Sequence, residues 1–277
     1  MDIITVNVGQ GSLAIVRHNG DAIIVDSYIP PSADETVAYV KGILAALLKN
    51  YFVRGLILTG FDADHSDASG VGLVLKKYRP EWVMYPKYYK DTETAKNVFQ
   101  IINQQEKERA QTDRPLEKIS VRLDKVESRI LKGLSQPFDF ELFSPHPEDM
   151  DNSNNSGIVL RVQGKGAGGF SYLITGDTEN SRWDTINRLF GKSLLSDVMA
   201  APHHGAKTGA NVKTLLLVAP NTILISAGVD NQYGHPDSQA VAVFSKVAKH
   251  VYSTHVSGGV SLITSPGIGD FETKLIK

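Results

Sequence analysis

Cysteine is absent from the 277 residues of the sequence, which excludes disulfide bonds, thiolate metal ligands and a cysteine nucleophile. No apolar run approaches the roughly 20 residues that a membrane-spanning helix requires. The N-terminus also lacks the charged segment and cleavage site of a signal peptide. We therefore expect a cytoplasmic protein without membrane contact, whose oligomeric state the sequence leaves open.

An excess of either charge is missing as well. Lys and Arg number 29 and Asp and Glu number 30, which gives a net charge of −1. The composition therefore supplies no basic field of the kind that drives non-specific binding to nucleic acids. A local basic patch or a bound metal ion would be needed to hold a phosphate group.

Short β-rich runs alternate with segments of helical periodicity, which is typical of α/β (α+β) domains. No linker of flexible composition divides the chain, so we predict one domain over 1–277 with two sheets packed face to face and helices outside. The charged segment at about 87–132 predicts a helical insertion. We favour a solvated connecting helix, and the alternative is an arm that carries Lys and Arg beside the substrate. Strands are predicted at 3–8, 13–17, 22–26, 82–85, 138–143, 157–162, 171–175, 197–201, 222–227, 250–254, 260–264 and 271–276, with one more around Leu56, and helices at 34–49, 70–78, 90–110, 182–190, 212–218 and 238–249.

The strand around Leu56 ends in an unusual cluster of polar residues. Asp62, Asp64 and His65 follow it within four positions, close enough to face one cation. The alternative is a solvated turn that caps the next helix through Ser66 or Asp67. On this stretch alone, both interpretations stay open.

Other predicted strands also end in Asp or His, and this favours the metal interpretation. Because the carboxyl ends of parallel strands gather at one edge of a sheet, these side chains are expected to meet. Several independent loops with such residues are less probable under the capping interpretation than one loop is. The residues concerned are Asp62, Asp64, His65, Asp177, His203, His204 and His235.

Seven short motifs occur in an order that resembles the metallo-β-lactamase superfamily, and within it the soluble nuclease-like domain of ComEC-type competence proteins. This resemblance spans almost the whole chain except 87–132. The motifs are Val8-Gly9-Gln10-Gly11, Ile24-Val25-Asp26, Phe61-Asp62-Ala63-Asp64-His65, Asn154-Asn155-Ser156, Thr175-Gly176-Asp177, Ala201-Pro202-His203-His204-Gly205 and Asn231-Gln232-Tyr233-Gly234-His235-Pro236.

The resemblance implies a four-layer αββα sandwich with a metal centre at one edge, between the sheets. The superfamily's loop His-x-His-x-Asp-His reads here with Gly60 at the first His and Asp62 at the second. A further first-site histidine corresponds to Asn154 or Asn155, so the first ion position has lost its imidazoles.

The second ion position keeps its ligands by the same resemblance. They are Asp64, His65, Asp177 and one histidine of the pair His203 and His204. We expect His204 to be the ligand, because the superfamily's ligand precedes the glycine. Asp62 is a ligand only if a second ion binds.

A divalent ion with such ligands lowers the pKa of a bound water molecule and polarises a scissile bond. We expect one or two ions of manganese or zinc, with magnesium as a further possibility. Asp64, His203 and His235 are the candidate catalytic residues, and His235 would act as an acid or as a phosphate clamp. Asn231, Tyr233 and Lys207 are candidates for substrate contact, and Asp26 and Asn155 for supporting the ligands.

The function predicted from these features is a metal-dependent phosphodiesterase or nuclease that acts on nucleic acid or a nucleotide. One alternative is a hydrolase of a small ester, lactone or amide. Another is a catalytically eroded protein that binds a nucleotide or a partner protein, because Gly60 and Asn155 replace ligands.

Overall fold

Two mixed β-sheets lie at the centre of the computed structural model, which describes residues 1–30, 34–149, 152–257, 260–267 and 270–276. The first sheet has the strand order β15-β14-β1-β2-β3-β4-β5-β6. Its strands are β1 (Asp2–Thr5), β2 (Ala14–His18), β3 (Asp21–Val25), β4 (Phe52–Ile57), β5 (Trp82–Pro86), β6 (Glu117–Val121), β14 (Val260–Gly267) and β15 (Asp270–Ile276).

The second sheet comes from the middle and later part of the chain and has the order β13-β12-β11-β10-β9-β8-β7. In the first sheet, the consecutive strands β3, β4, β5 and β6 are parallel to one another. In the second sheet, the same holds for β10, β11, β12 and β13. The strands of the second sheet are β7 (Ile130–Leu131), β8 (Phe138–Ser144), β9 (Val159–Gly164), β10 (Ser171–Ile174), β11 (Val198–Ala200), β12 (Thr222–Ile225) and β13 (His250–Ser253).

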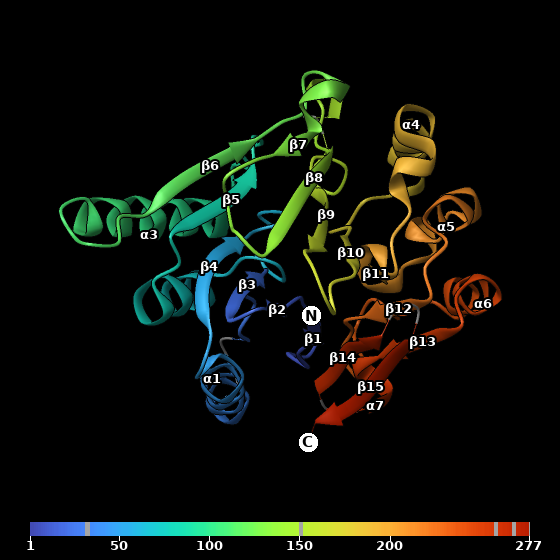
Figure 1. Ribbon diagram of the computed structural model, residues 1–277, viewed down its shortest axis with the longest axis horizontal. Coiled ribbons are helices and arrows are strands. Elements are labelled where there is room, and N and C mark those ends of the chain that lie inside the picture. Colours follow the sequence, from blue (N-terminus) through green and yellow to red (C-terminus); the bar gives the residue numbers. More distant parts are fainter. Residues whose placement is uncertain (31–33, 150–151, 258–259, 268–269, 277) are drawn as a thin grey trace.

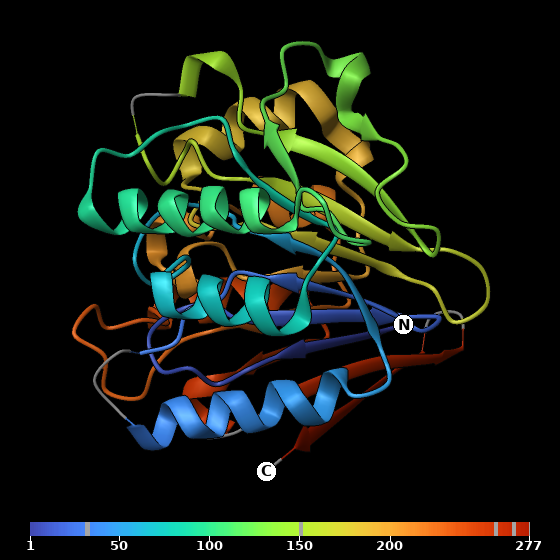
Figure 2. The same ribbon diagram turned by 90° about the vertical axis from the view of Figure 1, so that its left-hand side faces the viewer.

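Helices cover the outer face of each sheet, so the molecule has the four layers that the resemblance implies (Figures 1 and 2). The first sheet is covered by α1 (Asp34–Leu48), α2 (Ala68–Leu73) and α3 (Glu93–Arg109), and α2 continues as a π-helical turn over Val74–Tyr78. The second is covered by α4 (Asn180–Phe190), α5 (Val212–Val218) and α6 (Ser238–Val247), and a short α7 (Thr254–Ser257) follows β13. No helix in these described ranges is long and apolar enough to cross a membrane.

Burial on both faces explains why the strands are continuous apolar runs. In β1, Ile3 belongs to the core between the sheets, whereas its neighbour Ile4 packs under the outer helices with Val40 of α1 and Val98 of α3. Ile23 and Ile24 of β3 divide in the same way. The period-2 alternation of side chains thus supplies two hydrophobic layers from one strand.

The structure differs from the sequence prediction in two places. The segment 87–132 is helical over α3, but it also contains β6, which forms an edge of the first sheet, and β7. The strands β14 and β15 leave the second half of the chain and extend the first sheet, where β14 pairs antiparallel with β1. The prediction gave the number and kind of the layers but not this exchange.

Candidate metal centre

The acidic loop after β4 is folded back by its own backbone. The amides of His65 and Ser66 both donate to the carbonyl of Asp62 at 3.0 Å, which closes a turn. The amide of Ser12 donates to the carbonyl of Asp64 at 2.7 Å and fixes the loop against the segment before β2. Asp67 caps α2 by accepting from the amides of Ser69 and Gly70, so the capping interpretation holds for Asp67 while Asp64 and His65 stay available.

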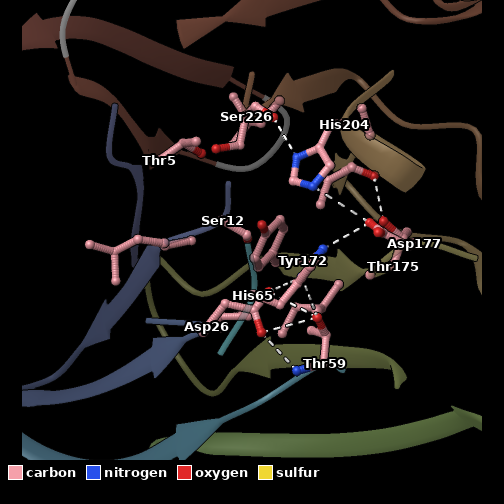
Figure 3. Close-up of a pocket in the computed structure, with 18 residues that line it drawn as sticks. Thr5, Ser12, Asp26, Thr59, His65, Tyr172, Thr175, Asp177, His204 and Ser226 are labelled. Atoms are coloured by element: carbon pink, nitrogen blue, oxygen red, sulfur yellow. Dashed lines mark hydrogen bonds and ion pairs between the residues drawn. The ribbon is translucent and has the colours of Figure 1, made fainter. Parts of the chain in front are cut away.

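Asp26, at the end of β3, supports His65 from below. Its carboxylate lies 2.9 Å from Nδ1 of His65 and accepts from the amide of Thr59 at 2.7 Å (Figure 3). The hydroxyl of Thr59 lies within 3.0 Å of both carboxylate oxygens. This contact leaves Nε2 of His65 directed toward the centre of the site, as expected for an orienting carboxylate.

The sequence after β11 places His204 opposite His65. His203, His204 and Gly205 all have positive φ angles, of 50°, 54° and 80°. This left-handed conformation is uncommon for residues with a side chain and is typical of functional sites. Nδ1 of His204 donates to the carbonyl of Ser226 at 2.8 Å, which fixes the ring and its tautomer.

The other ring nitrogen of His204 identifies the centre. Nε2 is buried and makes no hydrogen bond to any described residue. It lies 3.4 Å from Oδ2 of Asp64 and 3.7 Å from Oδ1 of Asp177. These contacts are ion pairs without hydrogen-bond geometry, so the two carboxylates compensate the burial of this atom only in part.

A divalent ion fits these residues. Asp64, His65 and His204 each offer a ligand atom within 4.8 Å of the others, and Nε2 of His65 lies 2.9 Å from Oδ1 of Asp177. Ligands held tetrahedrally at about 2.1 Å from an ion lie about 3.4 Å apart, close to the 3.4 Å and 3.7 Å that separate Nε2 of His204 from Asp64 and Asp177. Two carboxylates and two imidazoles also suit an ion of intermediate hardness. The cavity behind them, of about 40 Å³, is lined by Asp26, Thr59 and Ser226 together with His65, Asp177 and His204.

The electrostatics of the four residues are strongly coupled. Burial alone would lower the pKa of His65, but the carboxylates of Asp177 and Asp26 outweigh it and raise that pKa well above 6.5. Burial would likewise raise the pKa of Asp177, but His65 and His204 hold it far below its usual value. The pKa of His204 is raised by Asp177 and Asp64 against burial, and that of Asp64 is lowered by His204 and His65 against burial. Without a metal ion, protons therefore neutralise the carboxylates.

Asp62 has a different environment from the four residues above. Its carboxylate forms an ion pair with the ammonium of Lys90, which comes from the loop before α3. Asn154 lines a small hollow beside Asp62, His65 and Asp177. Asn155 turns away and accepts from the amide of Glu179 at 3.1 Å. Of the two asparagines, Asn154 is thus the one beside the centre.

His203 and His235 flank the centre on the more exposed side. The two rings meet edge to face with their centroids 5.5 Å apart, and Nε2 of His203 lies 3.9 Å from Asp177. Burial, together with His203 and His204, lowers the pKa of His235. A neutral His235 disfavours the phosphate-clamp role and suits a proton acceptor or a neutral donor. Tyr233 stacks on this ring and is exposed.

The remaining candidates for substrate contact are placed less favourably. The side-chain amide of Asn231 is used within its own loop: it donates to the carbonyl of Gly228 at 2.9 Å and accepts from the amides of Tyr233 and His235 at 3.1 Å. It shapes the loop that carries His235. Lys207 is exposed on the short 3₁₀ turn Lys207–Gly209 after the histidine pair.

Sequence reasoning missed several residues near the centre. Thr59 and Ser226 support the two histidines, and Glu179 lies 3.7 Å from Nδ1 of His203. Glu179 follows Asp177 by two positions and could have been noticed from that spacing. Lys90 could not be singled out, because it lies 28 residues after Asp62 among the many charged residues of the predicted insertion.

The four layers, with the candidate ligands at the carboxyl ends of strands from both sheets, define a metallo-β-lactamase fold. Solved structures with this architecture agree. A protein of Bacillus subtilis described as metallo-β-lactamase fold aligns over 99% of this chain and 100% of its own, with a TM-score of 0.50 and 12% identity. Human tRNase Z, short form, aligns over 91% of this chain and 96% of its own, with a TM-score of 0.54 and 10% identity. A metallo hydrolase of Ignicoccus hospitalis aligns over 100% of both chains, with a TM-score of 0.51 and 12% identity.

Among curated proteins, the chain is similar to competence proteins. ComE operon protein 3 of Bacillus subtilis is 24% identical over 216 residues, which cover 78% of this chain and 25% of that protein. Competence protein ComA of Neisseria gonorrhoeae is 32% identical over 125 residues, which cover 44% of this chain and 17% of that protein. The chain thus spans a quarter or less of these relatives. No model of a protein family matches the sequence.

Proposed function

We propose that this protein is a metal-dependent hydrolase of phosphodiesters, with nucleic acid or a nucleotide as its substrate. One observation carries the metal dependence: the buried Nε2 of His204 has no hydrogen-bond partner among the described residues and faces Asp64 and Asp177 beside His65. Burial of such an atom costs free energy that a bound ion or ligand would offset.

Asp64, His65, Asp177 and His204 would hold the ion, and we favour manganese or zinc from their mixed carboxylate and imidazole donors. When bound, a divalent ion in such a site lowers the pKa of a coordinated water molecule and polarises a phosphoryl oxygen. Asp26 keeps His65 in the tautomer and orientation that a ligand requires. Ser226 does the same for His204 through its carbonyl.

His235 is the group we propose for proton transfer. Its lowered pKa keeps the imidazole neutral near pH 7, so that it can accept a proton during the reaction. Its Nδ1 is buried without a hydrogen-bond partner among the described residues. Tyr233, stacked on the imidazole and exposed, is positioned to contact the substrate beside the reacting group.

The proposed substrate class rests on the relatives. The curated proteins similar to this chain carry names that refer to competence, and a solved structure of similar fold is a human tRNase Z. The net charge of −1 argues for a small or single-stranded substrate rather than a long duplex, which would require a basic track.

The test is hydrolysis by the purified protein after removal of metal and addition of manganese or zinc. Single-stranded DNA and RNA oligonucleotides, duplex DNA and bis(4-nitrophenyl) phosphate are the substrates. We expect turnover that EDTA abolishes, that Asp64→Asn lowers by at least about 100-fold, and that Asp184→Asn, on the exposed face of α4, leaves unchanged. Turnover of a lactone without cleavage of any phosphodiester would favour the ester or lactone alternative. Failure to bind either metal at micromolar concentration would favour a non-catalytic binding role.

A further inference from the structure

Lys90 forms an ion pair with a residue at the edge of the metal centre. It lies in the loop that joins β5 to α3, and its ammonium contacts the carboxylate of Asp62. The two side chains are 28% and 25% exposed, so the contact lies at the surface of the site rather than in the core. The ammonium also lies 3.5 Å from the hydroxyl of Ser153.

Both partners of Lys90 line the small hollow that borders the ligands. Asp62 and Ser153 line this hollow together with His65 and Asp177. Gly60, which also lines the hollow, contributes no side chain. The positive charge of Lys90 therefore lies against two residues of the same hollow that His65 and Asp177 line.

Negative charge is in excess around the centre. Asp62, Asp64 and Asp177 alone bring three negative charges, which a single divalent ion does not neutralise, and Asp26 and Glu179 lie close by. Lys90 supplies one further positive charge. A second divalent ion at Asp62 would be repelled by the ammonium of Lys90 at close range.

We propose that Lys90 provides the second positive charge of the centre in place of a second metal ion, and that its ammonium binds an anionic phosphoryl oxygen of the substrate. The choice of phosphoryl group rests on the proposed function. An ammonium has three donors, of which Asp62 takes one and Ser153 lies at the limit for a second. At least one N–H therefore remains for a ligand on the solvent side, where a lysine acts as a point charge for phosphate.

A purely structural ion pair is the competing explanation, and it makes a different prediction. A partly exposed pair of this kind contributes less than about 1 kcal/mol to stability. Removal of Lys90 would then change the melting temperature slightly and ligand binding not at all. Under our proposal the change in stability is equally small, but anion binding is lost.

The experiment compares Lys90→Met, Lys90→Arg and the wild-type protein loaded with Mn²⁺. Lys96→Met is the matched control, because Lys96 lies on α3 and pairs with the exposed Asp91 rather than with Asp62. Bound Mn²⁺ per chain is measured by equilibrium dialysis and metal analysis, and binding of inorganic phosphate by calorimetry. We expect one Mn²⁺ per chain in the wild-type protein, and a Kd for phosphate that rises about tenfold in Lys90→Met, in line with the loss of a charge-assisted hydrogen bond. Lys90→Arg should stay within about threefold of the wild type, and Lys96→Met should not differ.

Two results would overturn the inference. One is two Mn²⁺ ions per chain in the wild-type protein, and the other is an unchanged Kd for phosphate in Lys90→Met with its fold intact by circular dichroism. Neither measurement needs turnover. Phosphate binding that depends on Lys90 in a protein that cleaves no phosphodiester would support this inference and refute the proposed function. Phosphodiester cleavage together with an unchanged Kd for phosphate in Lys90→Met would support the proposed function and refute this inference.

Discussion

Nε2 of His65 lies 2.9 Å from Oδ1 of Asp177, although 112 positions separate the two residues in the sequence. His65 follows β4 of the first sheet and Asp177 follows β10 of the second, so the contact spans the gap between the sheets. The pKa of His65 is raised and that of Asp177 is lowered, as expected for a buried ion pair. In the absence of a metal ion, the proton on His65 thus compensates part of the negative charge of Asp177.

Replacement of Asp177 should remove this arrangement. We expect Asp177→Asn to weaken binding of Mn²⁺ or Zn²⁺ by at least about 100-fold, since loss of a residue that merely orients a ligand already costs about 10- to 100-fold. Equilibrium dialysis with metal analysis measures the change. Asp184→Asn serves as the control, because Asp184 is exposed on α4 and contacts Asn211 rather than the centre. Equal metal affinity in the two variants would contradict the proposed ligand set.

Asp26 should affect the metal through His65 alone. Asp26→Asn keeps the shape of the side chain but removes the charge that orients the imidazole, so we expect about a 10- to 100-fold loss of metal affinity. At saturating metal, hydrolysis should recover substantially, because Asp26 does not line the small hollow beside Asp62 and Asp177. Titration of activity against metal concentration separates the two effects. A loss of activity that no concentration of metal restores would instead assign Asp26 a direct role.

Gly205 should be required for the position of His204. Its φ is +80°, and a Cβ atom built there would lie 2.8 Å from Cβ of Pro236. We expect Gly205→Ala to lower the free energy of unfolding by about 1–3 kcal/mol and to weaken metal binding. Gly42→Ala, inside α1 with open space around it, should be neutral or stabilising. Urea unfolding of both variants tests this, and similar midpoints for the two would refute it.

His146 gives the fold a pH dependence that is independent of the metal. Burial and the neighbouring Arg182 lower its pKa to about 4. In the unfolded chain, the pKa of this histidine is near 6.5, so between about pH 6.5 and pH 4 the unfolded chain binds a proton that the folded protein does not bind. Its contribution to stability is therefore lost as the pH falls from about 6.5 to 4. Between pH 7 and pH 5, we expect the wild-type protein to lose about 1 kcal/mol more than His146→Asn in urea unfolding. An equal loss in both would exclude this role.

Much of the fold follows from local patterns in the sequence. The prediction of a helix at 34–49 matches α1 closely, and that at 212–218 coincides with α5, because apolar spacing and capping residues act over a few positions. The edge strand β6 was not predicted, because its half-exposed residues show neither a helical nor a clear alternating pattern. The pairing of β14 with β1 was not predicted for another reason. It joins two strands that lie far apart in the sequence, and no local pattern encodes such a contact.

The site divides along the same line. Asp64, His65, Asp177 and His204 could be proposed as neighbours because each follows a strand, and such strand ends do converge here. The contact of Lys90 with Asp62 could not, because a flexible side chain reaches into the site from a loop that no motif marks. Asn231 shows a third case: the residue belongs to the expected loop, but its amide is consumed by that loop's own backbone.

The place of β14 in the first sheet has a consequence for how the protein is made. Ile4 of β1 pairs with Leu262, so β1 acquires one of its two neighbours only after a long stretch of further chain has been synthesised. Until then, β1 presents an unpaired edge, which is a template for association with other chains. Non-local strand pairing of this kind is also slow to form. Completion of the first sheet therefore waits for the ribosome to deliver β14, and chaperones that shield strand edges during translation should raise the yield of folded protein.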